Sequence, residues 1–395
     1  MTSTMKPYER IEGVYVHTPF CLQKCRYCDF PSYAGCPAAQ REQYVRALCQ
    51  EIRQGRDWYG TLPVDPHATI YFGGGTPTVL TTDQLARIVS ALRDAGWWND
   101  PAEVTIEANP GTVNRDSLRA LRELGFDRIS LGVQSLQDEE LQALGRIHTA
   151  AEAREAVTLA RDAGFKRINI DLMYGLPGQT LASYRDTLRQ AAALGLQHLS
   201  AYSLILEEGT PLEQLVSSGQ VTLPDDDTVY AMYEETDRFW TAQGLQRYEI
   251  SNYAVPGQES RHNEVYWRYE PYAAFGAAAC GFDGFRRRTN PAGVDAYIAA
   301  VRQGTDAGLW WSEERLSAPV RLEEALFMGL RMVQGVSLSE LDERFGVDIL
   351  SIYKVEIADL QRRGMLQRDG DRMALTKYGM RFGNEAFAAF IRSEG

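Results

Sequence analysis

Short apolar segments alternate with amphipathic segments through the first two thirds of the chain. The apolar segments predict strands at residues 14–19, 68–75, 103–110, 128–135, 167–177 and 198–206. The amphipathic segments predict helices at 38–57, 82–95, 113–124, 151–163 and 180–194. Strands that are apolar on both faces and alternate with helices are typical of a parallel sheet. The pattern therefore predicts an α/β fold, a partial barrel of six βα units that is open on one side.

The pattern changes after residue 210. Residues 230–245 predict a helix and 248–257 a strand with a turn, whereas 258–290 are aromatic, glycine-rich and irregular. From about residue 313 the chain predicts three helices and then a short hairpin in "MLQRDGDRMALT", an order typical of winged-helix domains. We divide the chain into a barrel core at 1–210, a barrel extension at 211–310 and an α-rich, winged-helix-like domain at 311–395.

The charge argues against a role on nucleic acid. The net charge is -12 at pH 7, whereas nucleic-acid binding needs a basic face that displaces counterions. Winged helices often bind DNA, but the third predicted helix, "ILSIYKVEIADLQRRG", has few basic residues for phosphate contacts. We therefore expect this domain to have a structural or protein-contact role, and a DNA-reading protein is the hypothesis that the charge favours least.

The chain starts with "MTSTMKPYER", which has no apolar signal segment. No stretch approaches the roughly 20 apolar residues of a membrane span. The sequence predicts a soluble, cytoplasmic protein, and both a homodimer and peripheral contact with a membrane are compatible with it.

Polar residues and glycines gather where the predicted strands end. The segment from Cys21 to Cys28 follows the first strand, and "GGGTP" at 73–77 ends the second. Glu107, Gln134 and Asp171 end the next three strands. Taken alone, Glu107 or Asp171 could be a helix cap or a turn former, and Gln134 could be a loop contact. Because the carboxyl ends of parallel barrel strands meet on one side, together they predict one shared cavity.

Three of the six cysteines lie within eight residues, "CLQKCRYC", with the spacing C-x3-C-x2-C. Three thiolates cannot complete a tetrahedral structural zinc site. They can hold three irons of a [4Fe-4S] cluster, which leaves the fourth iron open to a small molecule. Cys21, Cys25 and Cys28 are therefore the predicted metal ligands.

This spacing at the end of a first barrel strand resembles the radical SAM superfamily, and the resemblance covers most of the chain. It implies that the free iron binds the amino and carboxylate groups of S-adenosylmethionine. It further implies reductive cleavage of the sulfonium to a 5′-deoxyadenosyl radical. "GGGTP" matches the segment that binds the methionyl ammonium, since glycines let backbone groups approach a ligand closely.

The segments "VYVHTPFCLQKCRYCDF", "EANPGT", "GVQS", "LGRIH", "IDLMYGLPGQT" and "RHNEVYW" resemble the coproporphyrinogen dehydrogenase (HemN) group, and within it the HemW branch of heme chaperones. By this resemblance Tyr15, Gly74 and Glu107 contact the cluster-bound cofactor. The positions that match a second cofactor pocket of the dehydrogenases are Tyr27, Gly75, Thr76, Gln134, Arg146 and Asp171.

Two departures separate the chain from the dehydrogenases. The dehydrogenases carry a further cysteine two residues after the third cysteine of the triplet, where this chain has Phe30. They also carry a long extension before the triplet, where this chain has only 20 residues. The missing extension would help to enclose the substrate, and radical chemistry needs a closed site. The resemblance therefore implies a chaperone that binds heme and delivers it to hemoproteins. The alternative is a radical enzyme on tetrapyrroles, either a coproporphyrinogen III dehydrogenase or a heme-degrading methyltransferase.

Heme needs an apolar slot and an axial ligand, most often His, Cys, Met or Tyr. The first candidate is His262, between the aromatic residues of "RHNEVYW", although a structural turn is the simpler interpretation. Cys280 is the second candidate, with core filler as the alternative. His148 follows as a third candidate because it lies near the predicted cavity.

Overall fold

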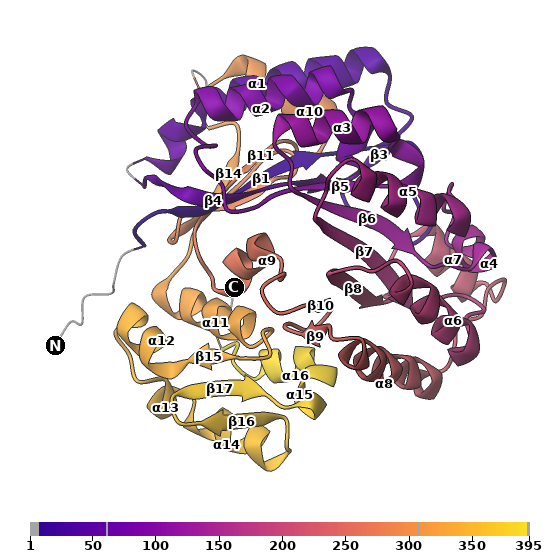
Figure 1. The fold of residues 1–395 in the computed structure, drawn as a ribbon. Helices are drawn as coiled ribbons and strands as arrows, with labels where there is room; N and C mark the ends of the chain where they lie inside the picture. The colour runs from indigo at the N-terminus through magenta and orange to yellow at the C-terminus, as the bar shows by residue number, and fades with distance from the viewer. Residues whose placement is uncertain (1–7, 61, 306–308, 393–395) are drawn as a thin grey trace.

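The computed structural model describes residues 8–60, 62–305 and 309–392. Within them, a curved sheet of twelve strands forms the larger part of the molecule, in the order β14-β13-β12-β11-β1-β4-β5-β6-β7-β8-β10-β9 (Figure 1). Its centre is parallel and consists of β11 (Tyr272–Phe275), β1 (Ile11–Thr18), β4 (Val64–Gly74), β5 (Val104–Ala108), β6 (Arg128–Gln134), β7 (Arg167–Tyr174) and β8 (His198–Ser203). The predicted partial barrel is confirmed.

The edges of this sheet are antiparallel. One edge carries β12 (Cys280–Phe282), β13 (Arg286–Thr289) and β14 (Ser312–Arg315), and the other carries β10 (Asn252–Ala254) and β9 (Gln246–Arg247). The expectation that 258–290 is irregular was wrong, because this segment forms α9 (Arg261–Trp267) and the strands β11 to β13. β11 is only four residues long and is followed by "GAAACG", so its alternation is too short to predict a strand.

Helices cover the outer face of the sheet (Figure 1). They are α1 (Ala38–Tyr59), α2 (Thr82–Asp94), α3 (Arg115–Leu124), α5 (Ala150–Asp162), α6 (Leu181–Ala192), α8 (Asp226–Ala242) and α10 (Val294–Gln303), with the short α4 (Asp138–Ala143) and α7 (Pro211–Ser217). Thr81, Thr149 and Thr180 each begin a helix with a reciprocal capping box, which satisfies backbone donors of the first turn. These local signals explain why the predicted helix starts were close to the observed ones.

The strands are apolar because both of their faces are covered. Side chains from β1, β4, β5 and β6 are completely buried in the main core, among them Val14, Val16, Ile70, Phe72, Ile106 and Ile129. Each buried aliphatic side chain of this size contributes about 1.5–3 kcal/mol to folding. The same packing fixes the directions of the strand ends, from which the polar side chains project.

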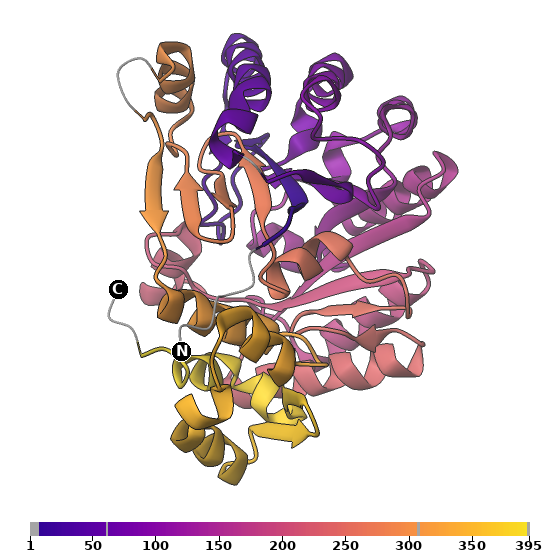
Figure 2. The same ribbon diagram turned by 90° about the vertical axis from the view of Figure 1, so that its left-hand side faces the viewer.

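The C-terminal part has its own apolar core. It contains α11 (Ala318–Gly329), α12 (Leu338–Phe345), α13 (Ile349–Ile352), α14 (Lys354–Arg362), α15 (Lys377–Arg381) and α16 (Gly383–Ala388). A three-stranded sheet completes it, with β15 (Val336–Ser337), β17 (Arg372–Leu375) and β16 (Leu366–Asp369) in that order. The helices α11 to α14 precede the β16–β17 hairpin, with the third predicted helix divided into α13 and α14, and this order confirms the winged-helix-like arrangement (Figure 2).

This C-terminal part contacts both ends of the curved sheet. At one end, Arg287 of β13 forms an ion pair with Glu324 of α11. At the other end, Lys377 of α15 lies 3.2 Å from Asp237 of α8. The two contacts place the C-terminal part across the open side of the partial barrel. None of the helices in the described residues is long and apolar enough to cross a membrane.

Candidate functional site

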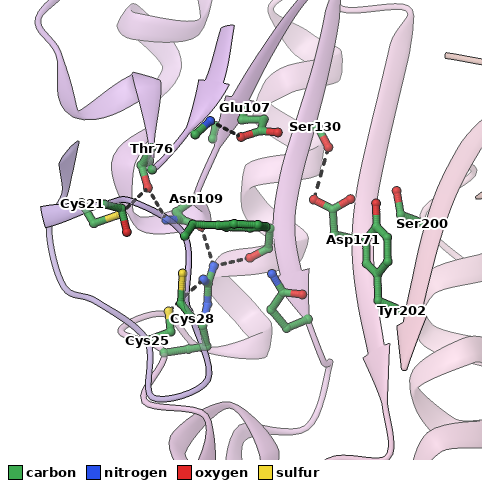
Figure 3. Close-up of a pocket in the computed structure, with 18 of the residues that line it drawn as sticks. Cys21, Cys25, Cys28, Thr76, Glu107, Asn109, Ser130, Asp171, Ser200 and Tyr202 are labelled. Atoms are coloured by element: carbon green, nitrogen blue, oxygen red, sulfur yellow. Dashed lines mark hydrogen bonds between the residues drawn. The ribbon is translucent and has the colours of Figure 1, made fainter. Parts of the chain in front are cut away.

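Side chains from the cysteine loop after β1 and from the strands β4 to β8 surround a cavity of about 340 Å³, here called the cysteine cavity. Most of the sequence-predicted site residues line it: Cys21, Cys25, Tyr27, Cys28, Gly74, Gly75, Thr76, Glu107, Gln134, Arg146 and Asp171. Figure 3 shows the three cysteines on one side of the cavity and Asp171 on the other. The prediction that these residues share one cavity is therefore confirmed.

The cysteine loop is held by backbone contacts with two neighbouring segments. Thr76 donates its backbone N–H to Phe20 O at 2.7 Å, next to Cys21 in β2 (Phe20–Cys21). Further along, Arg26 N–H donates to Leu144 O at 3.0 Å. These bonds place Cys21 beside the glycine-rich end of β4, and Cys25 and Cys28 beside the loop that carries Arg146.

The three thiols are free and half-buried. Among the described residues, no three His, Cys, Asp or Glu side chains converge as ligands of one metal ion. The thiols instead face a shared space, and each ligand of an iron–sulfur cluster binds a different iron. Three cysteines without a fourth protein ligand fit a cluster that keeps one open iron.

Arg146 brings a positive charge to this space. Its Nη1 donates to Cys25 Sγ at 3.3 Å and its Nη2 to Asn109 Oδ1 at 2.5 Å. Nη2 also donates to Gly132 O, while Nε is buried without a partner. A cation that already bonds a cysteine sulfur would offset the negative charge that thiolates and a cluster bring into a buried site.

The glycines after β4 bring the backbone close to the cavity. Gly74 has φ +109°, and a Cβ there would lie 2.5 Å from His17 Cε1. At Gly75 a Cβ would lie 2.7 Å from Phe20 O. No larger residue fits either position without a shift of its neighbours, so Gly74 and Gly75 are explained by close packing against His17 of β1 and Phe20 of β2.

Two carboxyl groups face the cavity beyond the glycines. Burial raises the pKa of Glu107 to about 7, although Tyr71 donates its hydroxyl to Oε1 at 2.6 Å and Gly74 N–H donates to Oε2 at 3.2 Å. Burial also raises the pKa of Asp171, against hydrogen bonds from Asn169 at 2.9 Å and Ser130 at 3.3 Å. Shifted carboxyl groups in a shared cavity are typical of functional sites.

Gln134 has an unusual backbone conformation. Its φ is 67°, in the left-handed region that non-glycine residues rarely adopt. The pairing of β6 with β7 also shifts register between Gly132 and Gln134, as at a β-bulge. Bulges beside functional sites redirect side chains, and here the bulge turns the Gln134 side chain into the cavity.

Tyr15 is the cofactor-contact prediction that does not line the cavity. Its ring stacks on Tyr71 with centroids 6.2 Å apart, and its hydroxyl lies 3.0 Å from His17 Nδ1. Tyr15 therefore packs against Tyr71, which itself lines the cavity.

Several lining residues were not predicted: Tyr71, Asn109, Arg128, Ser130, Asn169, Ser200, Tyr202 and Asn263. A sequence signal existed for most of them, because polar residues recur at every second position of otherwise apolar strands. β6 has Arg128, Ser130 and Gln134 on one face, and β7 has Asn169 and Asp171. This period of two marks the face that points into the barrel.

Comparison with known proteins agrees with this geometry. Residues 15–191 match the radical SAM superfamily, and residues 316–382 match the HemN C-terminal domain. The chain is 35% identical to the heme chaperone HemW of Bacillus subtilis over 96% of this chain and 99% of that protein. The chain belongs to the HemW family of the radical SAM superfamily. Escherichia coli HemW is also 35% identical, over 96% of this chain and 98% of its own length.

A solved structure shows the same fold as this HemW family member. Coproporphyrinogen III oxidase (HemN) from Escherichia coli, described as a radical SAM enzyme, superimposes with a TM-score of 0.82. The alignment has 25% identity and covers 97% of this chain and 90% of that one. Membership of the superfamily implies a [4Fe-4S] cluster and S-adenosylmethionine, and the three free thiols around one cavity fit this donor set.

The first heme-ligand candidate, His262, lies outside the cavity. It is completely buried, and its Nδ1 and Nε2 lie 2.8 Å from Thr69 Oγ1 and Tyr266 Oη. The ring also stacks on Tyr71 at 5.0 Å, and burial lowers its pKa to about 3. With both nitrogens hydrogen-bonded inside the protein, the ring offers no free lone pair to a heme iron in this conformation.

The other two candidates also lie apart from the cavity lining. His148 is buried, and its Nε2 hydrogen-bonds to Val133 O at 3.2 Å, while burial lowers its pKa to about 4. Its Nδ1 is buried without a partner. Cys280 is half-buried on β12, where Thr289 Oγ1 donates to its sulfur at 3.3 Å. None of the three heme-ligand candidates therefore lines the cysteine cavity.

Proposed function

We propose that this protein binds heme and delivers it to hemoproteins such as respiratory enzymes, and that it carries a [4Fe-4S] cluster with S-adenosylmethionine in the cysteine cavity. The observation that carries the proposal is the end-to-end similarity to heme chaperones, at 35% identity over 96% of the chain. Phe30 also supports it. This residue stands where the resemblance places a further cysteine in the dehydrogenases, and it is 62% exposed.

We infer distinct roles for the residues of the cavity. Cys21, Cys25 and Cys28 would hold three irons, and when bound the cluster supplies an electron for cleavage of the sulfonium. The backbone of Gly74 and the carboxyl group of Glu107 would accept the methionyl ammonium, since they adjoin each other at 3.2 Å. Asp171 would contact the rest of the cofactor from the wall opposite the cysteines, Gln134 from the end of β6, and Arg146 from beside Cys25.

A radical enzyme acting on tetrapyrroles is the second candidate. It is favoured by the TM-score of 0.82 with Escherichia coli coproporphyrinogen III oxidase. A chaperone and an enzyme differ in what happens to the tetrapyrrole: the first returns it unchanged, and the second releases an altered porphyrin together with 5′-deoxyadenosine.

Anaerobic reconstitution with iron, sulfide and S-adenosylmethionine separates the two functions. The protein is incubated with heme and, in parallel, with coproporphyrinogen III, and all tetrapyrroles are analysed by liquid chromatography and mass spectrometry. We expect a stable heme complex, unaltered porphyrin, and transfer of that heme to an added apo-hemoprotein. Conversion of coproporphyrinogen, or heme degradation coupled to 5′-deoxyadenosine, would replace the chaperone by the enzyme.

The remaining partner assignments stay predictions. We expect acceptor hemoproteins to contact the C-terminal winged-helix-like domain, and a cytoplasmic location. Size-exclusion chromatography with light scattering tests the homodimer, and flotation with vesicles tests peripheral membrane contact.

A further inference from the structure

A second, larger cavity lies between the barrel edge and the C-terminal part. It has a volume of about 730 Å³ and is here called the α8 cavity. Its walls come from the ends of β7 and β8, from α8, and from the segment 380–385 around α15 and α16. Ligand sites for small molecules usually measure about 300–1,000 Å³. The α8 cavity therefore has the size of a site for a drug-sized or cofactor-sized molecule.

The walls of the α8 cavity are rich in flat rings. Tyr174 and Tyr202 contribute from the strands, Tyr230 and Tyr233 from α8, and Phe382 from the C-terminal part. At the rim, Ile205 is 65% exposed. Flat apolar surfaces that face an open space suit a flat, largely apolar ligand.

Two arginines in this cavity form no hydrogen-bonded ion pair within the described residues. Arg331 packs its guanidinium over Trp267 at 4.4 Å, and its Nε is buried without a hydrogen bond. Arg381 lies over the ring of Tyr230 at 3.4 Å. Neither is within ion-pair distance of a carboxylate in the described part of the chain, whereas the nearby Arg247 is paired with Asp237 at 3.2 Å. The charge of Arg331 interacts with the buried carboxyl group of Glu249, so Arg381 is the more available of the two cations. In a chain with a net charge of -12, unpaired arginines facing one cavity indicate an anionic ligand.

Acidic residues also reach the rim of the α8 cavity. Asp226 and Glu385 are exposed, and Glu385 forms an ion pair with Arg363. The carboxylate of Glu385 is already neutralised by Arg363, and both acidic side chains lie in solvent. They therefore offset the positive charge of the Arg331 guanidinium only weakly.

We propose that the α8 cavity binds the flat ring of a porphyrin, with Arg331 and Arg381 as partners of its two propionate carboxylates. This inference rests on the proposed heme function and gives it a location. Tyrosine rings contact the faces and edges of the macrocycle, while each guanidinium donates to a carboxylate, the pairing in which arginine forms its strongest hydrogen bonds.

The location also brings heme next to the cysteine cavity. Tyr202 lines both cavities, with its ring at the end of β8 (Figure 3). None of His262, Cys280 and His148 lines the α8 cavity. Heme bound there would therefore lie beside the cofactor but apart from all three ligand candidates.

The test compares hemin with its dimethyl ester, which has the same ring and iron but no carboxylates. Both are titrated by absorbance into the reconstituted protein and into the double variant Arg331→Met/Arg381→Gln. Arg119→Gln is the matched control, because Arg119 is exposed on α3, far from this cavity, and forms no ion pair within the described residues. The single variant Arg381→Gln keeps the test valid if the double variant misfolds, since this exposed side chain loses no ion pair and only its ring contacts with Tyr230 and Phe382.

We expect the wild type and Arg119→Gln to bind hemin about tenfold or more tightly than the ester, because charge-assisted pairs are lost with the carboxylates. The double variant should bind both ligands alike, and Arg381→Gln should lose part of the preference. Equal affinity of the double variant and the wild type for hemin would overturn this location while leaving the heme function intact. A wild type that binds no hemin would instead overturn the proposed function itself.

Discussion

Two polar clusters share residues of β4, and they differ in whether their hydrogen bonds are complete. The cysteine cavity has free thiols, an arginine Nε without a partner, and carboxyl groups with raised pKa values. The His262 cluster, formed by Thr69, Tyr71, His262 and Tyr266, is closed and internally bonded. Both contain residues that are typical of sites, but only the first has groups left over for a ligand.

The difference shows that residue type alone does not identify a site. A buried histidine with two protein partners stabilises packing, because any ligand would have to replace bonds that already exist. A thiol that faces an open cavity loses little when it binds metal. Tyr71 connects the clusters, since its ring stacks on His262 and its hydroxyl donates to Glu107.

The largest effect is expected from the cysteines. Replacing Cys21, Cys25 or Cys28 by Ala should remove nearly all iron and the brown absorbance after anaerobic reconstitution, because a cluster with two protein ligands is not retained. Iron and sulfide analysis measures this. Cys36→Ala is the matched control, as Cys36 is also half-buried and free but does not line the cavity, and it should keep its iron.

The next effect is on stability and concerns the closed cluster. His262→Ala removes a completely buried ring, two hydrogen bonds and a stacking contact, which should lower the free energy of unfolding by about 2–4 kcal/mol. Urea denaturation measures the change. His67→Ala should change it by less than about 0.5 kcal/mol, because 67% of the His67 side chain is exposed. A stable His262→Ala variant that no longer binds heme would make His262 a ligand after all.

A pH effect of intermediate size is expected at Glu107, which borders both clusters. Because burial raises its pKa to about 7 in the folded protein, the protonated form is favoured there. Its contribution to stability is present below its ordinary pKa and is lost as the pH rises through 7. Between pH 5 and 8 the wild type should lose about 2–3 kcal/mol relative to Glu107→Gln. If the difference in the free energy of unfolding between the wild type and Glu107→Gln is the same at pH 5 and pH 8, the raised pKa is contradicted. Urea denaturation at both pH values measures it.

The smallest effect is expected at Cys280. Its side chain is half-buried on β12 and its sulfur accepts one hydrogen bond from Thr289. Cys280→Ser keeps a polar atom of similar size, so the free energy of unfolding should change by less than about 1 kcal/mol. Heme titration should give the wild-type spectrum. A shifted Soret band in this variant would place Cys280 on the iron.

The βα order could be predicted because each strand and helix carries its own local signal. The apolar strands around Ile70 and Ile129 and the capped start of α2 are such cases. The cysteine cavity could be predicted as well, because parallel strands bring their carboxyl ends to the same side. Two features that bear on ligand binding could not be predicted: both ring nitrogens of His262 are bonded to Thr69 and Tyr266, and Arg331 Nε is buried without a hydrogen bond. Both depend on contacts between distant segments.

The most direct test of the central claim is electron paramagnetic resonance of the reduced, reconstituted protein with and without S-adenosylmethionine. A cluster held by three cysteines has one open iron, so we predict a [4Fe-4S] signal that changes when S-adenosylmethionine binds that iron. Cys36→Ala should behave in the same way, and Cys28→Ala should give no signal. A cluster signal that S-adenosylmethionine leaves unchanged, or zinc bound in place of iron, would contradict the account.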